Sequence, residues 1–168
     1  MNLHPIIVHF PVALLSLYGV LELLRFRKLQ AQPYFFHIKG TFLIFGSLFS
    51  FLALVTGEAA EKAITNDETR ALVEKHSFFG TLSAYVFGFL ALVYLISWIS
   101  RTDFGMNIKS RFWIEASALA GKIRASFLVI LLACIGLISI TITGALGASI
   151  VYGPTIDPAV QFIYNLVL

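Results

Sequence analysis

Four long apolar segments constrain this chain more than any other feature of its sequence. A window of about 19 residues, matched to a hydrocarbon core about 30 Å thick, finds them near residues 5–24, 36–56, 78–99 and 125–152. The last two contain no charged residue. Because a helix satisfies its own backbone hydrogen bonds in lipid, the pattern predicts an all-α, integral membrane four-helix bundle. We expect a single transmembrane domain over residues 1–168.

The composition excludes the other broad classes of protein. Hydrophobic residues make up 58% of the chain and charged residues only 12%, too few to cover the surface of a soluble domain of this length. The single cysteine, Cys134, excludes a disulfide within the chain and a cysteine-based metal cluster. The net charge of +3 is then a signal of topology and predicts no nucleic-acid partner. The expected surroundings are a lipid bilayer.

The distribution of Lys and Arg predicts the orientation. Nine of the twelve lie either from Arg25 to Lys39, around the start of the second span, or in the loop 100–124, and three lie in the loop 57–77. The positive-inside rule places the first two groups in the cytoplasm. Both termini and the loop 57–77 then face outward, which is the periplasm for a multi-pass protein of the bacterial inner (cytoplasmic) membrane. Glu22 and Lys39 lie near span ends, where we expect their side chains to extend to the interface.

Shorter helices are expected outside the spans. Apolar residues at helical spacing around Trp113 predict an interfacial amphipathic helix in the cytoplasmic loop. In the tail 153–168, Asp157 as N-cap and Pro158 at the first helical position predict a second interfacial helix. In the outer loop, a capping box at Thr65 predicts that the third helix begins near Asp67.

The first and third spans resemble each other. Four residues of the first span recur in the third at one constant offset: His9, Leu15, Ser16 and Tyr18 match His76, Leu82, Ser83 and Tyr85. If each begins a helical hairpin, the two halves form a parallel repeat about an axis along the membrane normal. Chance identity between apolar helices is the alternative.

The histidines are the main candidates for chemistry. The topology places His4, His9 and His76 at the outer face and His37 alone inside. Ionisable groups at the edge of the hydrocarbon are usually functional. Two such imidazoles on neighbouring helices are the axial ligand set of a haem b, so His9 and His76 are the predicted ligands of one haem iron. His4 would contact a propionate or replace one ligand.

Small residues follow the predicted ligands on the same helix faces. Gly80 and Ala84 lie below His76, and Ala13 lies below His9. They would make room for a macrocycle, or they form an ordinary packing face between helices.

A different metal site is the competing interpretation of the same face. His4, His9 and His76 together with Glu58 or Glu61 offer imidazole and carboxylate ligands for a transition metal. The two glutamates are three residues apart and can share a helix face, but such a pair is also typical of a solvated helix end.

Three motifs resemble a known bacterial family. The opening from His4 to Pro11 reads HPIIVHFP, a second motif begins at Thr56 as TGEAAE and is followed by EKH up to His76, and a closing motif reads GALGASIVYG. The chain is similar in these motifs to the membrane family catalogued as domain of unknown function 2231. The resemblance implies four spanning helices, with His4, His9 and His76 as characteristic polar positions, and it supplies no activity.

From these residues we expect a b-type cytochrome-like electron-transfer protein or respiratory-complex subunit that binds one haem near the periplasmic face. Its expected partners are a quinol pool and a periplasmic cytochrome or larger respiratory complex. We expect no enzymatic activity from the chain alone. A cofactor-free accessory or assembly subunit and an outer-face metal-binding membrane protein are the alternatives.

Overall fold

The fold was analysed in a computed structural model, which describes residues 3–62 and 67–168. All regular secondary structure in these residues is helical. Four long helices are α2 (His9–Leu23), α4 (Pro33–Glu61), α5 (Asp67–Ile99) and α8 (Leu128–Tyr152). With α1 continuing α2 outward, these four are long and apolar enough to cross a membrane. The all-α architecture of a multi-pass membrane protein is confirmed.

Five short helices complete the chain. They lie at the ends of the long helices or between them: α1 (His4–Ile7), α3 (Arg27–Gln30), α6 (Asp103–Met106), α7 (Arg111–Ala125) and α9 (Pro158–Val167). The predicted interfacial helix around Trp113 is α7, and the predicted helix of the tail is α9. As predicted, Asp157 caps α9, because its side chain accepts hydrogen bonds from the backbone N–H groups of Ala159 and Val160 at 2.8 and 3.0 Å.

Proline explains why the first span consists of two helices. Helix α1 ends at Ile7, and α2 begins at His9. Pro11 has no N–H group to donate to the carbonyl of Ile7, so the regular hydrogen-bond ladder is interrupted there. The third span begins at Asp67, as the sequence predicted, while the capping box at Thr65 and Glu68 lies outside the residues or side chains that the structure describes.

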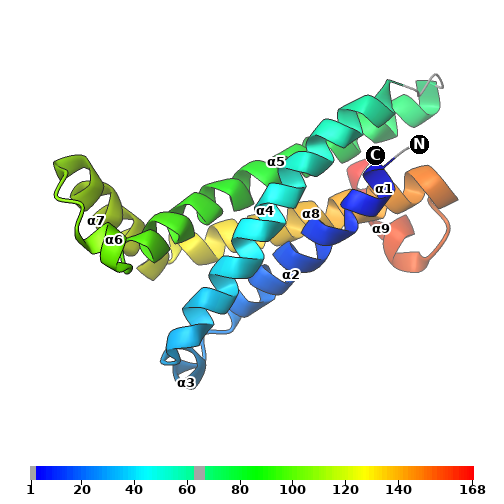
Figure 1. The fold of residues 1–168 in the computed structure, drawn as a ribbon. Helices are drawn as coiled ribbons and strands as arrows, with labels where there is room; N and C mark the ends of the chain where they lie inside the picture. Colours follow the sequence, from blue (N-terminus) through cyan, green and yellow to red (C-terminus); the bar gives the residue numbers. More distant parts are fainter. Residues whose placement is uncertain (1–2, 63–66) are drawn as a thin grey trace.

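The long helices form a bundle in which α2 packs on α4, α4 on α5, α5 on α8 and α8 on α2 (Figure 1). The core between them is apolar and rich in aromatic rings. Tyr18 of α2 lies 6.0 Å from Phe87 and 5.7 Å from Tyr94 of α5, between ring centroids. Because these contacts join the two hairpins α2–α4 and α5–α8, the aromatic core holds the halves together.

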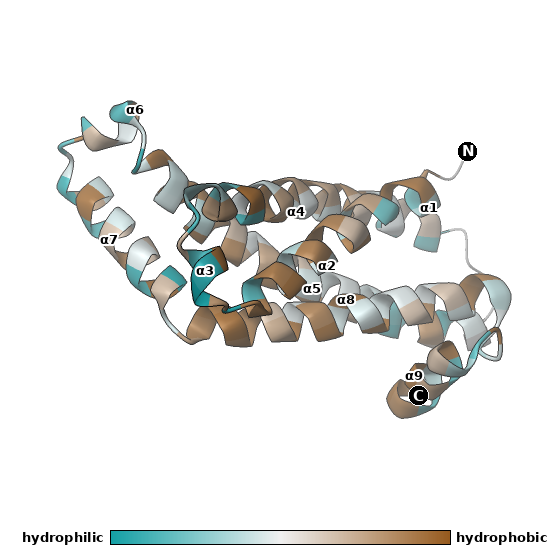
Figure 2. Ribbon diagram, turned by 90° about the horizontal axis from the view of Figure 1, so that it is seen from below, coloured by the Kyte–Doolittle hydropathy of each residue, from teal (hydrophilic) through white to brown (hydrophobic). Residues whose placement is uncertain are grey.

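The outward faces of the long helices are suited to lipid. Phe45, Leu48, Leu92 and Ile138 are each more than half exposed. Figure 2 shows brown, hydrophobic residues along the long helices and teal, hydrophilic residues at α3 and α6. Exposed apolar side chains of this size on every helix would be unfavourable in water and are stable in a hydrocarbon.

The two ends of the bundle differ. Helices α1 and α9, both termini and the beginning of α5 lie together at one end (Figure 1). We call this the histidine end, after His4 and His76. Helices α3, α6 and α7 lie at the opposite end, which we call the basic end, after Arg25, Arg101 and Arg124.

Candidate functional site

Two histidines meet at the histidine end of the bundle. His4 of α1 and His76 of α5 lie with their ring centroids 6.4 Å apart and their ring planes at 84°. Both side chains are half-buried. They are 72 positions apart in the chain, so the fold, and not local sequence, brings them together.

Hydrogen bonds fix the tautomer of each ring. The Nδ1 atom of His76 lies 2.9 Å from the carbonyl oxygen of Thr143 on α8, and a carbonyl oxygen only accepts. Nδ1 of His4 lies 3.2 Å from Oγ1 of Thr56 on α4. That hydroxyl donates to the carbonyls of Leu52 and Ala53, so it accepts from His4. These contacts indicate a proton on Nδ1 of each ring, as supporting hydrogen bonds commonly arrange it in metal-binding histidines.

A glycine lies against each ring. A Cβ atom placed on Gly57 would lie 3.1 Å from Cε1 of His4, and one placed on Gly147 would lie 3.2 Å from Cε1 of His76. Both distances are shorter than ordinary van der Waals contact. A side chain at either glycine would therefore displace the imidazole beside it.

The two halves of the bundle repeat this arrangement. In the first, the histidine of α1 contacts a threonine and a glycine of α4; in the second, the histidine of α5 contacts a threonine and a glycine of α8. By its contacts with a threonine and a glycine of the next long helix, His4 corresponds to His76. The constant sequence offset instead pairs His76 with His9. The match is partial. Thr56 contacts His4 through its hydroxyl and is followed by the contacting Gly57, whereas Thr143 contacts His76 through its backbone carbonyl and the contacting glycine is Gly147.

His9 lies apart from the pair. Its ring is exposed, and its Nδ1 atom lies 2.6 Å from the carbonyl oxygen of Pro5, one turn earlier. Among the described residues, the ring contact of His76 is with His4 and none is with His9. Ala13, one turn after His9, is exposed as well.

Neighbouring helices occupy the space beside the small residues that follow His76. A Cβ atom on Gly80 would lie 3.5 Å from Cγ2 of Thr143, and one on Gly88 would lie 3.0 Å from the ring of Phe51. Ala84, between them, is completely buried. This row is therefore a packing face for α8 and α4.

The candidate carboxylates lie beside a different pocket. Glu58 and Glu61 line a pocket of about 380 Å³ together with Lys62, Arg70 and Val73. Among the side chains that the structure describes, those of residues 3–62 and 69–168, no three of His, Cys, Asp or Glu come together as a metal site. The structure brings His4 to His76 and does not add a third ligand from the described residues.

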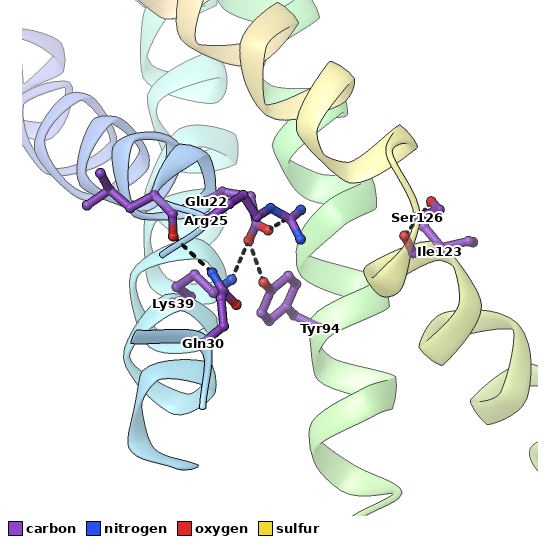
Figure 3. A network of polar contacts seen from close by, with 8 residues as sticks. Glu22, Arg25, Gln30, Lys39, Tyr94, Ile123 and Ser126 are labelled. Carbon is purple, nitrogen blue, oxygen red and sulfur yellow. Dashed lines mark hydrogen bonds and ion pairs between the residues drawn. The ribbon is translucent and has the colours of Figure 1, made fainter. Parts of the chain in front are cut away.

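A second polar cluster, which the sequence analysis missed, lies toward the basic end (Figure 3). Glu22 of α2 is 1% exposed, and its carboxylate accepts from Lys39 Nζ at 2.9 Å, from Arg25 at 3.0 Å and from the Tyr94 hydroxyl at 2.6 Å. The expectation that Glu22 and Lys39 extend to the interface is wrong for both, because each satisfies the other's charge inside the bundle. Opposite charges at the adjoining ends of consecutive spans were the sequence signal for this pair.

The comparison with protein families agrees with the three motifs that carried the resemblance. The family model described as predicted membrane protein (DUF2231) matches residues 1–157. The chain belongs to this family. No curated protein and no solved structure matches the chain. The family assigns no activity, so the site itself has to support one.

Proposed function

We propose that this DUF2231 protein is a membrane electron-transfer protein that binds one haem b at the histidine end, where His4 and His76 would hold its iron. The observation that carries the proposal is the pair itself: two half-buried imidazoles, 6.4 Å apart, from opposite halves of a four-helix bundle.

The donor set fits a metal ion held between two imidazoles. Metal–nitrogen bonds of about 2.0–2.1 Å on the facing sides of two rings require ring centroids roughly 6 Å apart. The hydrogen bonds to Thr143 and Thr56 hold the two imidazoles in defined orientations, as supporting hydrogen bonds do for metal-binding histidines. Since the row from Gly80 to Gly88 is filled by α8 and α4, the proposed site lies at the end of the bundle and not along its interior.

The polar groups around the pair would set the properties of the bound group. A haem held by His4 and His76 would supply one-electron transfer. The Thr143 carbonyl and the Thr56 hydroxyl hold the imidazoles in one orientation. This would lower the reorganisation energy of electron transfer. The glycines at 57 and 147 let both rings approach the backbone closely.

Topology determines which partners the site serves. The positive-inside rule places the basic end in the cytoplasm, so the histidine end and both termini face the periplasm of a bacterial inner membrane. One redox group near one face exchanges electrons with partners at that face. We therefore propose the membrane quinol pool as donor and a periplasmic cytochrome or larger respiratory complex as acceptor.

A reduced-minus-oxidised visible spectrum of the purified protein in detergent tests this assignment. The informative variants are His4→Ala and His76→Ala, with His9→Ala as the matched control from the same outer face. We expect sharp b-type bands in the parent and in His9→Ala, and their loss in the other two. Bands that survive in His4→Ala and disappear in His9→Ala would instead support the pair predicted from the sequence. Bound iron, copper or zinc without haem bands would show a metal-binding protein of another kind.

A further inference from the structure

We propose that the basic end binds the phosphate group of an anionic phospholipid between Arg101 and Arg124, beside the ring of Phe36. The guanidinium carbons of these two arginines lie 4.0 and 5.2 Å from the centroid of that one ring. Arg101 follows α5 and Arg124 lies in the last turn of α7, so two segments of the chain bring two cations to one place. This proposal does not depend on the proposed haem.

The charge at this place is not balanced within the described residues. Glu22 pairs with Arg25 and Lys39, and Glu115 pairs with Arg111. Neither Arg101 nor Arg124 forms an ion pair with a described carboxylate. Three more cations than carboxylates therefore surround the Phe36 and Tyr94 rings, because Lys39 lies over Tyr94 at 5.8 Å and Arg25 binds the same Glu22. An anion from outside the chain would restore the balance.

The two guanidinium groups also repel each other electrostatically. Partial burial, and then the neighbouring charge of Arg124, lower the pKa of Arg101 from its ordinary value. The Nε atom of Arg124 is buried and has no hydrogen-bond partner among the described residues. A phosphate group bound at the two guanidinium groups would relieve the repulsion between them, since guanidinium groups bind phosphate through paired N–H donors.

The depth of the site in the membrane favours a lipid as the source of the phosphate. Arg101 lies two residues beyond the end of α5 at Ile99, and Arg124 lies four residues before α8 begins at Leu128. Both are thus at the ends of membrane-spanning helices, where lipid head groups lie. Basic pockets between helices at this level are typical sites for anionic lipid head groups.

An apolar groove shares Trp98 with the surroundings of Phe36. It has a volume of about 360 Å³ between α4 and α5, and its walls are Thr41, Ile44, Phe45, Leu95, Trp98, Ile99 and Thr102. Its Trp98 ring lies 6.2 Å from the Phe36 ring that both arginines contact. A phospholipid matches both parts, because its acyl chain fills an apolar groove while its phosphate binds the cations. Free phosphate would account for the arginines alone.

Native mass spectrometry of the full chain, released from detergent with added lipid, tests the proposal. The probes are phosphatidylglycerol and phosphatidylcholine at equal concentration. We expect the parent protein to retain phosphatidylglycerol preferentially, and Arg101→Gln and Arg124→Gln to reduce this retention about fivefold each. Arg111→Gln, on the same helix as Arg124 and with the same change of charge, should retain the lipid as the parent does.

Three results would overturn the proposal. Equal retention of the two lipids by the parent would show no recognition of an anionic head group. An equal loss in Arg111→Gln would show attraction by net charge and not a site. Displacement of bound phosphatidylglycerol by millimolar inorganic phosphate would show a site for the free anion. If Arg101→Gln does not fold, Arg101→Lys keeps the charge, and we expect it to retain phosphatidylglycerol at an intermediate level.

Discussion

Removal of the Glu22 carboxylate should destabilise the bundle strongly. In Glu22→Ala, the Lys39 ammonium group, which is 5% exposed, loses its carboxylate partner 2.9 Å away, and the Tyr94 hydroxyl loses its acceptor. Breaking a buried ion pair by removing one partner costs about 3–5 kcal/mol, because the remaining charge stays buried and uncompensated. We therefore expect the free energy of unfolding to fall by about that amount. The assay is reversible unfolding in mixed micelles by titration with a denaturing detergent, followed by far-ultraviolet circular dichroism.

A double-mutant cycle separates the ion pair from the loss of packing. Lys39→Met combined with Glu22→Gln removes both charges and keeps most of the volume, so this pair of changes should cost clearly less than the sum of the single changes. Glu115→Gln is the control, because its partner Arg111 is 93% exposed and we expect no measurable change in stability. A loss below about 1 kcal/mol in Glu22→Ala, or strict additivity in the cycle, would refute the buried ion pair.

Two further results follow from the packing of the core and from the histidine pair. Gly136→Ala places a methyl group 2.6 Å from the Phe87 ring, so we expect it to lower the free energy of unfolding by about 1–3 kcal/mol. The control is Gly144→Ala on the same helix, whose added methyl group would meet no atom within 4 Å and should leave the stability unchanged. Equal melting temperatures of the two variants would contradict this packing. A protonated imidazole cannot bind a metal, so the visible bands of the His4 and His76 site should persist at neutral and alkaline pH and be lost in acid titration below about pH 6.5. Bands that instead disappear when the pH is raised would exclude neutral imidazole ligands.

The sequence predicts the helices well because lipid leaves the backbone few alternatives. Four apolar segments of spanning length can only form helices that pack side by side, and the interfacial helices follow from periodicity around Trp113 and from the cap at Asp157. The break of the first span at Val8 follows from Pro11, which interrupts the helix because it has no N–H group to donate.

The partner of each polar group was harder to predict, because contacts between helices depend on rotation about each helix axis. Hydropathy fixes which segments cross the membrane but not which face points inward. The sequence therefore identified His4, His9 and His76 as candidates without showing that His4, and not His9, lies beside His76. Because the rotation of each helix was unknown, the sequence also predicted Glu22 and Lys39 to be interfacial residues, whereas they form a buried ion pair.

The most direct test of the proposed function is the amount of haem bound per chain. The protein should be purified from cells with sufficient haem, incubated with haemin, freed of unbound haem, and assayed by pyridine haemochrome against total protein. Our account predicts one haem b per chain in the parent and in His9→Ala, and close to none in His4→Ala. A parent protein that binds no haem under these conditions, while it remains folded by circular dichroism, would contradict the account.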